Sequence, residues 1–376
     1  MDWDALRREE FGVAERWAYF DHAAVAPLPR RSVEMLGRWA AEQHAHGVVN
    51  RGRWEAPLAR VRDSCAKLLN AHVDEIAFVN STTHGIGLIA EGFPWQDGDN
   101  VVTAEEEYPS NLYPWLNLED RGVTLRTVPT RDGRVWPEDL EAAMDARTRV
   151  LTISHVEWAS GFRNDLHRLG EVCKRRGIAL FVDAIQGLGP LTVDVADTPI
   201  DFLCADGHKW LLGPEGAGLL YIRRAWIDRL RATGVGWHSV TTSYNVPGLN
   251  FHLKPSAERW EGGTQNVPGL LALGEGLDIY LGIGLHAASA RILEQAERAR
   301  EVSRRAGWEV VGSSRPGDLS GIVPIRKLGV DPDAFAALCR TRGVALSSRR
   351  GCVRLSPHVY NGDDDFARLA DVLATP

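Results

Sequence analysis

Cysteine is scarce in this sequence, and the spacing of the few cysteines excludes two of the residue's common uses. The 376 residues contain five cysteines, an odd number, and no two of them form a CxxC pair. A disulfide framework or a zinc site would require paired or clustered Cys and His residues at short spacings. We therefore expect reduced thiols, as in cytoplasmic proteins, and no metal centre.

Long apolar runs and an excess of positive charge are also lacking. No apolar run reaches the roughly 18 residues that a membrane span requires, and residues 1–20 are charged, unlike a secretory signal peptide. With 43 basic and 50 acidic residues the formal net charge is −7, whereas nucleic-acid binding relies on clustered Lys and Arg. We therefore expect neither a membrane protein nor a nucleic-acid partner.

Short apolar runs alternate with amphipathic stretches through the middle of the sequence. This alternation is typical of an α/β fold in which helices cover a mainly parallel sheet. Between two of the runs, an apolar face and terminal basic residues predict a helix over residues 165–176, which Gly177 ends. The runs themselves predict seven strands, at residues 75–79, 100–103, 124–128, 149–154, 179–182, 201–204 and 218–222.

The chain is longer than a single hydrophobic core usually supports, so we expect two domains. Residues 241–255 are rich in Ser, Asn, Pro and Gly, which is typical of an irregular connection. The expected division is a large domain over residues 15–250 and a smaller α+β domain over residues 251–376, with residues 1–14 packed on the smaller one. Within the smaller domain the pattern predicts one long helix over residues 270–306, a strand at 321–325, a helix at 332–342 and a terminal helix from 363.

The densest group of reactive side chains follows two neighbouring predicted strands. Asp183 and Gln186 come after one strand, and His208 and Lys209 after the next. Open α/β sheets bind their ligands at such carboxyl ends. Pyridoxal-phosphate chemistry needs a lysine amine for a Schiff base and an acidic partner for the pyridinium nitrogen, and Lys209 and Asp183 are of these types. Apolar residues on both sides of Lys209 predict burial, which lowers the pKa of an amine and makes it a better nucleophile.

Together with motifs elsewhere, these residues resemble the class V aminotransferase family of fold-type I pyridoxal-phosphate enzymes. That family includes cysteine desulfurases, selenocysteine lyases, kynureninases and isopenicillin-N-epimerase-like proteins. The resemblance extends from YFDHAAVAPLP at residues 19–29 to RLSPHVYN at 354–361. It implies that Lys209 carries the cofactor, that Asp183 contacts the pyridinium nitrogen and that Gln186 donates to the ring oxygen. His208 is a candidate for binding the phosphate or relaying a proton.

Three further motifs carry cofactor contacts in the same resemblance. STTHG (81–85) is similar to the phosphate loop, in which Thr82, Thr83 and His84 present hydroxyl and amide groups at a helix N-terminus; an ordinary helix cap is the alternative. In EYPSNLYPW (107–115), Tyr108 is the candidate for stacking on the cofactor, with core packing as the alternative. EGGTQN (261–266) is similar to a loop that sends a threonine, here Thr264, into the neighbouring subunit's phosphate site, which implies a homodimer with shared active sites.

The expected substrate contacts come from two more segments. RLSPH supplies Arg354, which resembles the arginine that binds the α-carboxylate of the amino-acid substrate. HVEWASG (155–161) places Glu157 and Trp158 where desulfurases have a small polar residue and an asparagine, so we expect a different pocket wall with Trp158 facing the substrate. The sequence WASGFRND resembles the epimerase-like branch, and its Arg163 either binds an acidic group of the substrate or holds the loop in place.

Two other residues depart from the desulfurase pattern. Cys352 lies two residues before Arg354, in a segment too short for the mobile loop whose cysteine carries a persulfide. We expect Cys352 to be a small buried residue, with a catalytic role as the alternative. Asp206 replaces a serine beside the phosphate site, where a carboxylate would be repelled, so we expect Asp206 to turn away.

The resemblance implies an enzyme that forms an external aldimine with an amino acid and removes the α-proton through Lys209. The leading hypothesis is β-elimination of the C–S lyase or cysteine-desulfurase kind, and epimerisation and amino transfer are the alternatives. Binding of the cofactor without turnover is a further alternative. A nucleotide-binding oxidoreductase is not indicated, because GLGP (187–190) lacks the GxGxxG pattern.

Overall fold

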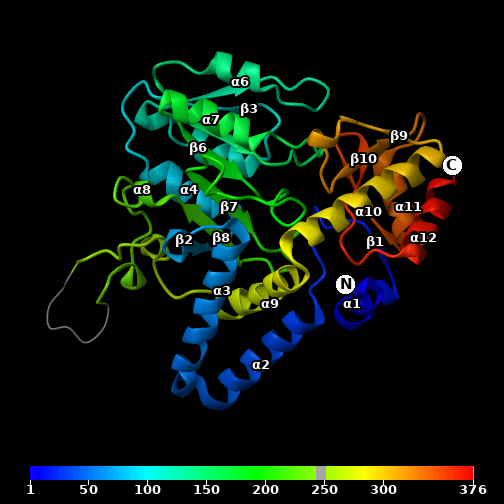
Figure 1. Cartoon of the computed structure of the whole chain (residues 1–376), viewed down its shortest axis with the longest axis horizontal. Helices are drawn as coiled ribbons and strands as arrows, with labels where there is room; N and C mark the ends of the chain where they lie inside the picture. Colours follow the sequence, from blue (N-terminus) through cyan, green and yellow to red (C-terminus); the bar gives the residue numbers. More distant parts are fainter. Residues whose placement is uncertain (243–250, 376) are drawn as a thin grey trace.

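A seven-stranded sheet forms the centre of the larger part of the molecule (Figure 1). The computed structural model describes residues 1–242 and 251–375. The strand order is β2-β8-β7-β6-β5-β3-β4; β8 is antiparallel to both neighbours and the other pairs are parallel. The mainly parallel seven-stranded sheet is thereby confirmed. The strands are β2 (Ile76–Val79), β3 (Asn100–Ala104), β4 (Thr124–Val128), β5 (Thr148–Ser154), β6 (Ala179–Asp183), β7 (Phe202–Asp206) and β8 (Gly218–Ile222).

Helices cover both faces of this sheet, which explains why its central strands are apolar along their whole length. On one face, α7 (Leu166–Arg176) packs Leu169 and Val172 into a core with β5 and β6 residues. On the other, α4 (Thr82–Gly92) packs with residues of β6 and β7. The predicted helix that Gly177 ends is confirmed as α7. Asp165 accepts from the Arg168 N–H at 3.0 Å, and Gly177 has φ +67°.

The start of α4 lies unusually close to the sheet because its fourth residue is glycine. A Cβ at Gly85 would collide with the sulfur of Cys204 on β7. The hydroxyl of Thr82 also accepts from the Asp206 N–H at 3.1 Å. These contacts hold the STTHG segment at the carboxyl end of β7, beside the loop that carries Lys209.

The carboxyl-terminal part contains a four-stranded antiparallel sheet in the order β12-β13-β10-β9. Figure 1 shows helices α10, α11 and α12 beside it. The amino-terminal segment packs on this part, because β1 (Ala18–Tyr19) pairs with β11 (Val344–Ala345) and Arg7 forms an ion pair with the buried Asp365. The remaining elements of this part are β9 (Glu309–Val310), β10 (Val323–Arg326), β12 (Ser347–Arg349), β13 (Cys352–Leu355), α10 (Leu285–Arg305), α11 (Pro332–Thr341) and α12 (Asp363–Leu373).

The single long helix expected over residues 270–306 is wrong. The chain forms α9 (Val267–Ile283) and α10, bent by 92° at Gly284, which has φ +90°. A residue with a side chain is strained at that φ, so the glycine permits the break that the continuous apolar pattern concealed. Leu270, Leu273 and Leu277 of α9 belong to the core of the large sheet. We therefore propose the bend at Gly284, rather than residue 250, as the boundary between the two parts.

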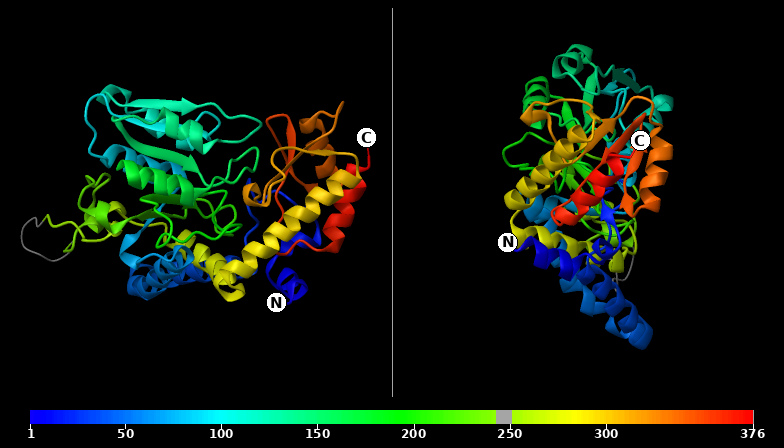
Figure 2. Two further views of the ribbon diagram at one scale, coloured as in Figure 1. Left: turned by 45° about the horizontal axis from the view of Figure 1, so that its top comes forward. Right: turned by 90° about the vertical axis from the view of Figure 1, so that its right-hand side faces the viewer.

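Several helices were not predicted from the sequence. Among them α2 and α3 project from the body of the molecule, and α9 packs against both (Figures 1 and 2). Of the irregular connection expected at residues 241–255, residues 243–250 lie outside the described residues, and Val240 and Leu253 form an antiparallel bridge between its flanks. The remaining helices are α1 (Trp3–Glu10), α2 (Arg30–His46), α3 (Glu55–Leu69), α5 (Tyr113–Leu116), α6 (Pro137–Ala143) and α8 (Arg224–Ile227).

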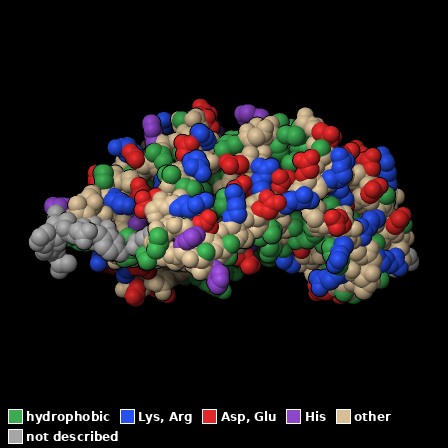
Figure 3. Space-filling model, turned by 90° about the horizontal axis from the view of Figure 1, so that it is seen from below, with side chains coloured by type: hydrophobic (Ala, Val, Ile, Leu, Met, Phe, Trp, Pro, Cys, Tyr) green, Lys and Arg blue, Asp and Glu red, His purple; other side chains and the backbone are tan. Residues whose placement is uncertain are grey.

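Acidic and basic side chains are interspersed over the face shown in Figure 3.

No single helix among the described residues has both the length and the apolar character to cross a membrane; only the bent pair of α9 and α10 reaches that length and composition together.

A buried ion pair joins α3, β2 and the segment before α9. Arg62 donates to both carboxylate oxygens of Glu261 and to the Ile76 carbonyl, and Glu261 also accepts from the Phe78 N–H at 2.9 Å. The Arg62 and Glu261 side chains are 10% and 1% exposed, so solvent screens the pair little.

We predict that Glu261→Ala lowers the free energy of unfolding by about 3–5 kcal/mol, because it leaves the Arg62 guanidinium buried without its partner. Denaturant titration measures the change. The control is Glu258→Ala, since the Glu258 side chain is 32% exposed and should cost about 1 kcal/mol or less. Equal losses in the two variants would contradict a stabilising role for the Arg62–Glu261 pair.

Candidate active site

Residues from separate segments of the sequence meet in one pocket of about 430 Å³ at the carboxyl ends of β6 and β7. The parallel strands bring these loops to one edge of the sheet, as expected for an open α/β fold. Of the site residues predicted from the sequence, this pocket is lined by Thr82, Thr83, Tyr108, Trp158, Asp183, Gln186, His208, Lys209 and Arg354.

Lys209 is the amine of the pocket. Among the described residues, none hydrogen-bonds to or forms an ion pair with its Nζ, which lies 5.7 Å from the centre of the Tyr108 ring. Burial lowers the pKa of Lys209 to about 8; the charge of Asp183 opposes this shift and that of Arg354 adds to it. A substantial fraction of the amine is therefore neutral and nucleophilic near neutral pH.

Asp183 is the carboxylate that faces Lys209. It is the last residue of β6, is 2% exposed and accepts from the Ile185 N–H at 3.0 Å. Burial raises its pKa to about 6, while the Ile185 N–H and the charge of Lys209 oppose the rise. Asp183 thus remains mostly ionised at neutral pH and offers a buried negative charge to a positively charged ring nitrogen.

Two further acids lie behind Asp183, and one of them was not predicted as a site residue. Glu107 accepts from the backbone N–H and the hydroxyl of Ser154, the residue paired with Asp183 across β5 and β6. Burial raises the pKa of Glu107 to about 7, and burial together with the charge of Glu107 raises that of Glu157 well above its usual range. Burial and the neighbouring carboxylate therefore favour the protonated form of Glu157. Glu107 was missed because it ends a run of three glutamates, a pattern typical of an exposed surface.

Both the oxygen and the nitrogen of the Gln186 side-chain amide form hydrogen bonds within the protein. Its Oε1 accepts from the Trp210 Nε1 at 2.8 Å, and its Nε2 donates to the Ala23 carbonyl at 2.9 Å. An amide nitrogen carries two hydrogens, so one N–H remains for a group in the pocket. The predicted donor is in place, with its orientation fixed from outside the pocket.

The STTHG segment supplies fewer donors than its sequence suggests. Ser81 caps α4 by accepting from the His84 N–H at 3.0 Å, and the His84 side chain is exposed and outside the pocket. The expectation that His84 contacts the phosphate is therefore not supported by the geometry. Thr82 and Thr83 do line the pocket, and the Thr83 hydroxyl donates to the Ser110 hydroxyl at 2.7 Å. Ser81 and Ser110, which also line it, were not predicted.

Asp206 does not turn away from the pocket, contrary to expectation. It is 5% exposed, lines the pocket and accepts from the Gly207 N–H at 2.7 Å. Its Oδ2 lies 3.0 Å from the His208 Nδ1. The His208 Nδ1 is buried and has no hydrogen-bond partner among the described residues, so this is a close contact rather than a hydrogen bond.

Arg354 presents an incompletely bonded guanidinium to the pocket. Its Nη1 donates to the Trp158 carbonyl at 2.9 Å, and its Nη2 is 3.6 Å from Asp21. The Nε and Nη2 atoms are buried and have no hydrogen-bond partner among the described residues. Burial lowers the pKa of Arg354 to about 10. These two donors form one edge of the guanidinium, the geometry that binds a carboxylate through two parallel hydrogen bonds.

Trp158 and Tyr108 form an aromatic wall of the pocket. Their rings meet edge to face at 5.5 Å, and the Trp158 Nε1 donates to the Glu106 carbonyl at 3.0 Å. Tyr108 is 44% exposed, so core packing does not account for its position.

Three residues considered for the site lie elsewhere. Arg163 lines a different cavity, and its N–H donates to the Asp318 carbonyl at 2.9 Å, so the structure separates it from Lys209. Thr264 is exposed on the segment before α9 and does not line the pocket, and its role towards a second subunit stays a prediction. Cys352 is half-buried outside the pocket lining, and burial raises the pKa of its thiol.

The described residues fit pyridoxal phosphate. A buried amine without a partner faces a buried carboxylate, one Gln186 N–H is free, and two hydroxyl residues stand at a helix N-terminus. The buried Nε and Nη2 of Arg354 remain for the carboxylate of a substrate.

Comparisons with known proteins agree with this geometry. A probable cysteine desulfurase of Methanothermobacter thermautotrophicus is 30% identical over 97% of this chain and 96% of its own length. The apo structure of a cysteine desulfurase from Thermococcus onnurineus NA1 superposes with a TM-score of 0.89 at 25% identity, covering 98% of this chain and 96% of the other.

A complex of the cystine C–S lyase C-DES with cysteine persulfide has the same fold, with a TM-score of 0.89 at 22% identity over 96% of this chain and 97% of the other. The family model described as aminotransferase class V matches residues 18–369. This chain therefore belongs to the class V aminotransferase family.

Proposed function

We propose that the protein is a pyridoxal-phosphate-dependent C–S lyase that acts on cysteine or a related sulfur amino acid. The observation that carries the proposal is the meeting, in one pocket, of Lys209, the buried carboxylate of Asp183 and the edge of Arg354 whose Nε and Nη2 have no hydrogen-bond partner among the described residues. Cysteine desulfurases among the relatives support the substrate class. Epimerisation and amino transfer remain the alternatives, because they begin with the same proton removal.

When bound, pyridoxal phosphate supplies an electron sink for the α-carbon of the amino acid. The residues of this chain divide the remaining tasks. Arg354 binds the α-carboxylate and so orients the substrate, and the neutral Nζ of Lys209 accepts the α-proton. Asp183 keeps a negative charge at the base of the pocket, opposite Lys209. The Tyr108–Trp158 wall covers one side of the pocket, and His208, which also lines it, is the candidate for donating a proton to a leaving group.

We also propose that the protein forms a homodimer. Thr264 is exposed close to Glu261, whose side chain is buried, and Val48 and Val49, which follow α2, are 76% and 83% exposed. Exposed apolar side chains on a projecting pair of helices support an interface with a second copy.

The activity test uses purified holoenzyme with cysteine and cystine as substrates. We predict that cysteine yields sulfide, pyruvate and ammonia and that cystine yields cysteine persulfide, pyruvate and ammonia. Lys209→Ala should lower turnover about 10³-fold or more and lose the visible absorption of the bound cofactor. An unchanged absorption band in Lys209→Ala would contradict the assignment of Lys209 as the residue that carries the cofactor. Inversion with α-deuterium incorporation and no elimination would favour the epimerase, and oxo-acid exchange the aminotransferase.

Cys352→Ala should release sulfur at a rate within about twofold of the unsubstituted enzyme. The thiol lies outside the pocket, and its raised pKa disfavours the thiolate that a sulfur transfer requires. The comparison uses the same sulfide and persulfide assays. A drop of about 100-fold would show instead that a persulfide on Cys352 is obligatory.

The pKa of Lys209 predicts how cofactor uptake depends on pH. Only the neutral amine attacks the cofactor's aldehyde, so the rate of binding to cofactor-free protein should rise with pH and level off above about 8. Asp183→Asn removes the charge that opposes the lowering of this pKa, so its midpoint should move to lower pH. Stopped-flow absorbance measures both. A midpoint in the usual lysine range, about 10.4, would contradict the burial of this amine.

A further inference from the structure

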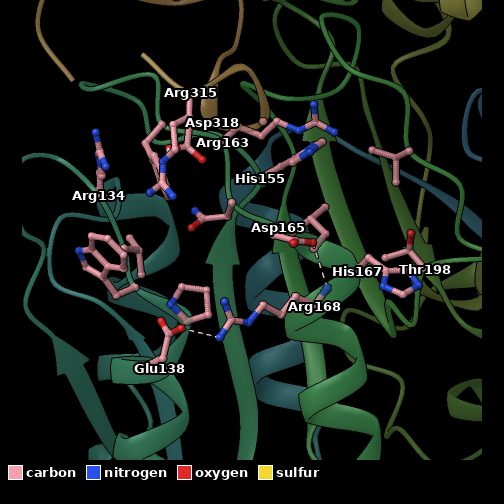
Figure 4. A pocket seen from close by; sticks show the side chains of 18 of the residues that line it. Arg134, Glu138, His155, Arg163, Asp165, His167, Arg168, Thr198, Arg315 and Asp318 are labelled. Carbon is pink, nitrogen blue, oxygen red and sulfur yellow. Dashed lines mark hydrogen bonds and ion pairs between the residues drawn. The ribbon is translucent and has the colours of Figure 1, made fainter. Parts of the chain in front are cut away.

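A second cavity, of about 620 Å³, is lined by the side chains shown in Figure 4. Its walls come from the segment before α6, the loop between β5 and α7, the loop after β6 and residues 315–318 of the carboxyl-terminal part. None of its lining residues lines the Lys209 pocket. The cavity is therefore a separate site, formed where the two parts of the molecule meet.

The acidic residues of this cavity already have donors within the chain. Figure 4 shows the ion pair of Glu138 and Arg168 on one side, with an N–O distance of 2.6 Å. Asp165 caps α7, and Asp318 lies 3.2 Å from the Arg315 Nε. Asp194 accepts from the Ala196 N–H and from Asn70. These carboxylates are thus compensated before any ligand arrives.

Two basic residues on the other side, Arg134 and Arg163, are not compensated. Among the described residues, no side chain or backbone group forms an ion pair or hydrogen bond with their guanidinium groups, and the Arg134 Nε is buried. Figure 4 shows Arg134 and Arg163 on the wall opposite Glu138, with Arg315 and Asp318 between them. An unpaired, partly buried guanidinium is costly unless a counter-ion is present.

His155 adds an independent observation. It is 3% exposed and lines the cavity, yet neither ring nitrogen bonds to any described residue. Burial, with the nearby charge of Arg163, lowers the pKa of His155 to about 3, so the ring is neutral and carries one N–H. A buried polar group without a partner is rare in folded proteins and indicates a ligand or ordered water at that point.

The amino-terminal turn of α7 also faces the cavity, through Leu166, His167 and Arg168. Helix N-termini carry partial positive charge and favour anions. From the unpaired guanidinium groups and the unbonded His155 ring together, we propose that this cavity binds a small anion with carboxylate or phosphate groups, held by Arg134, Arg163 and His155. The bound anion contacts both parts of the molecule, because Arg315 and Asp318 form part of the same wall.

The test uses holoenzyme, in which the cofactor already fills the Lys209 pocket, and calorimetric titration at constant ionic strength. Citrate and inorganic phosphate are titrated separately, so that carboxylate and phosphate ligands are distinguished. We predict that at least one of them binds with one site per chain and that Arg163→Gln and Arg134→Gln each weaken it about tenfold or more. Because the readout is binding, it stands independently of the proposed lyase activity.

Arg121→Gln is the matched control, since it makes the same change in net charge at a residue outside the cavity that pairs with Glu91. Its affinity should stay within about twofold of the unsubstituted protein. Hydrogen exchange supplies a readout that needs no substitution, because ligand should slow exchange at residues 162–168 and 315–318. Absence of binding by both anions, or equal affinity in Arg163→Gln, Arg134→Gln and Arg121→Gln, overturns the proposal.

Discussion

The carboxylate of Asp183 is buried at the end of β6, and the surrounding groups of the pocket must stabilise its negative charge. Removing a charge from water is costly unless the chain compensates it, and here the Ile185 N–H donates a hydrogen bond and the charge of Lys209 acts from a longer distance. Glu107 and Glu157 increase the cost, because they bring two more carboxyl groups into the same low-dielectric region. Burial raises the pKa of Glu157 well above its usual range, which favours its protonated form and limits the accumulated negative charge. Burial also lowers the pKa of the Lys209 amine, while the charge of Asp183 opposes that shift.

Much of the large sheet and the central residues of the pocket were predictable from the sequence. Parallel strands covered on both faces are continuous apolar runs, and the ligand-binding residues follow them directly, so Asp183 and Lys209 were placed at the correct strand ends. Arg354, Tyr108 and Gln186 were predicted as site residues from the motifs that contain them. Their hydrogen bonds were not predictable, because the partners of Gln186 and Arg354 are contributed by distant segments.

The failures have local physical causes. Gly284 breaks a stretch, residues 270–306, that contains no proline and has apolar residues on both sides of the glycine, so the sequence pattern alone predicted one helix. The acidic neighbours of Glu107 predicted an exposed position. Its buried carboxylate is stabilised by the hydroxyl of Ser154, which lies far along the chain. The charge of Asp206 predicted that this residue turns away from the phosphate site, but its carboxylate accepts from the neighbouring Gly207 N–H and lines the pocket.

The pairing of β1 with β11 has a consequence for the order in which the protein is completed during synthesis. Residues 18–22 take their backbone partners from residues 343–356, and Ala23 in turn accepts the bond that orients Gln186. The ribosome therefore releases this first segment long before its partners exist. The wall of the pocket that contains Ala23 can form only after residues 343–356 have been synthesised. A chain truncated before them would retain Lys209 and Asp183 but lack this wall.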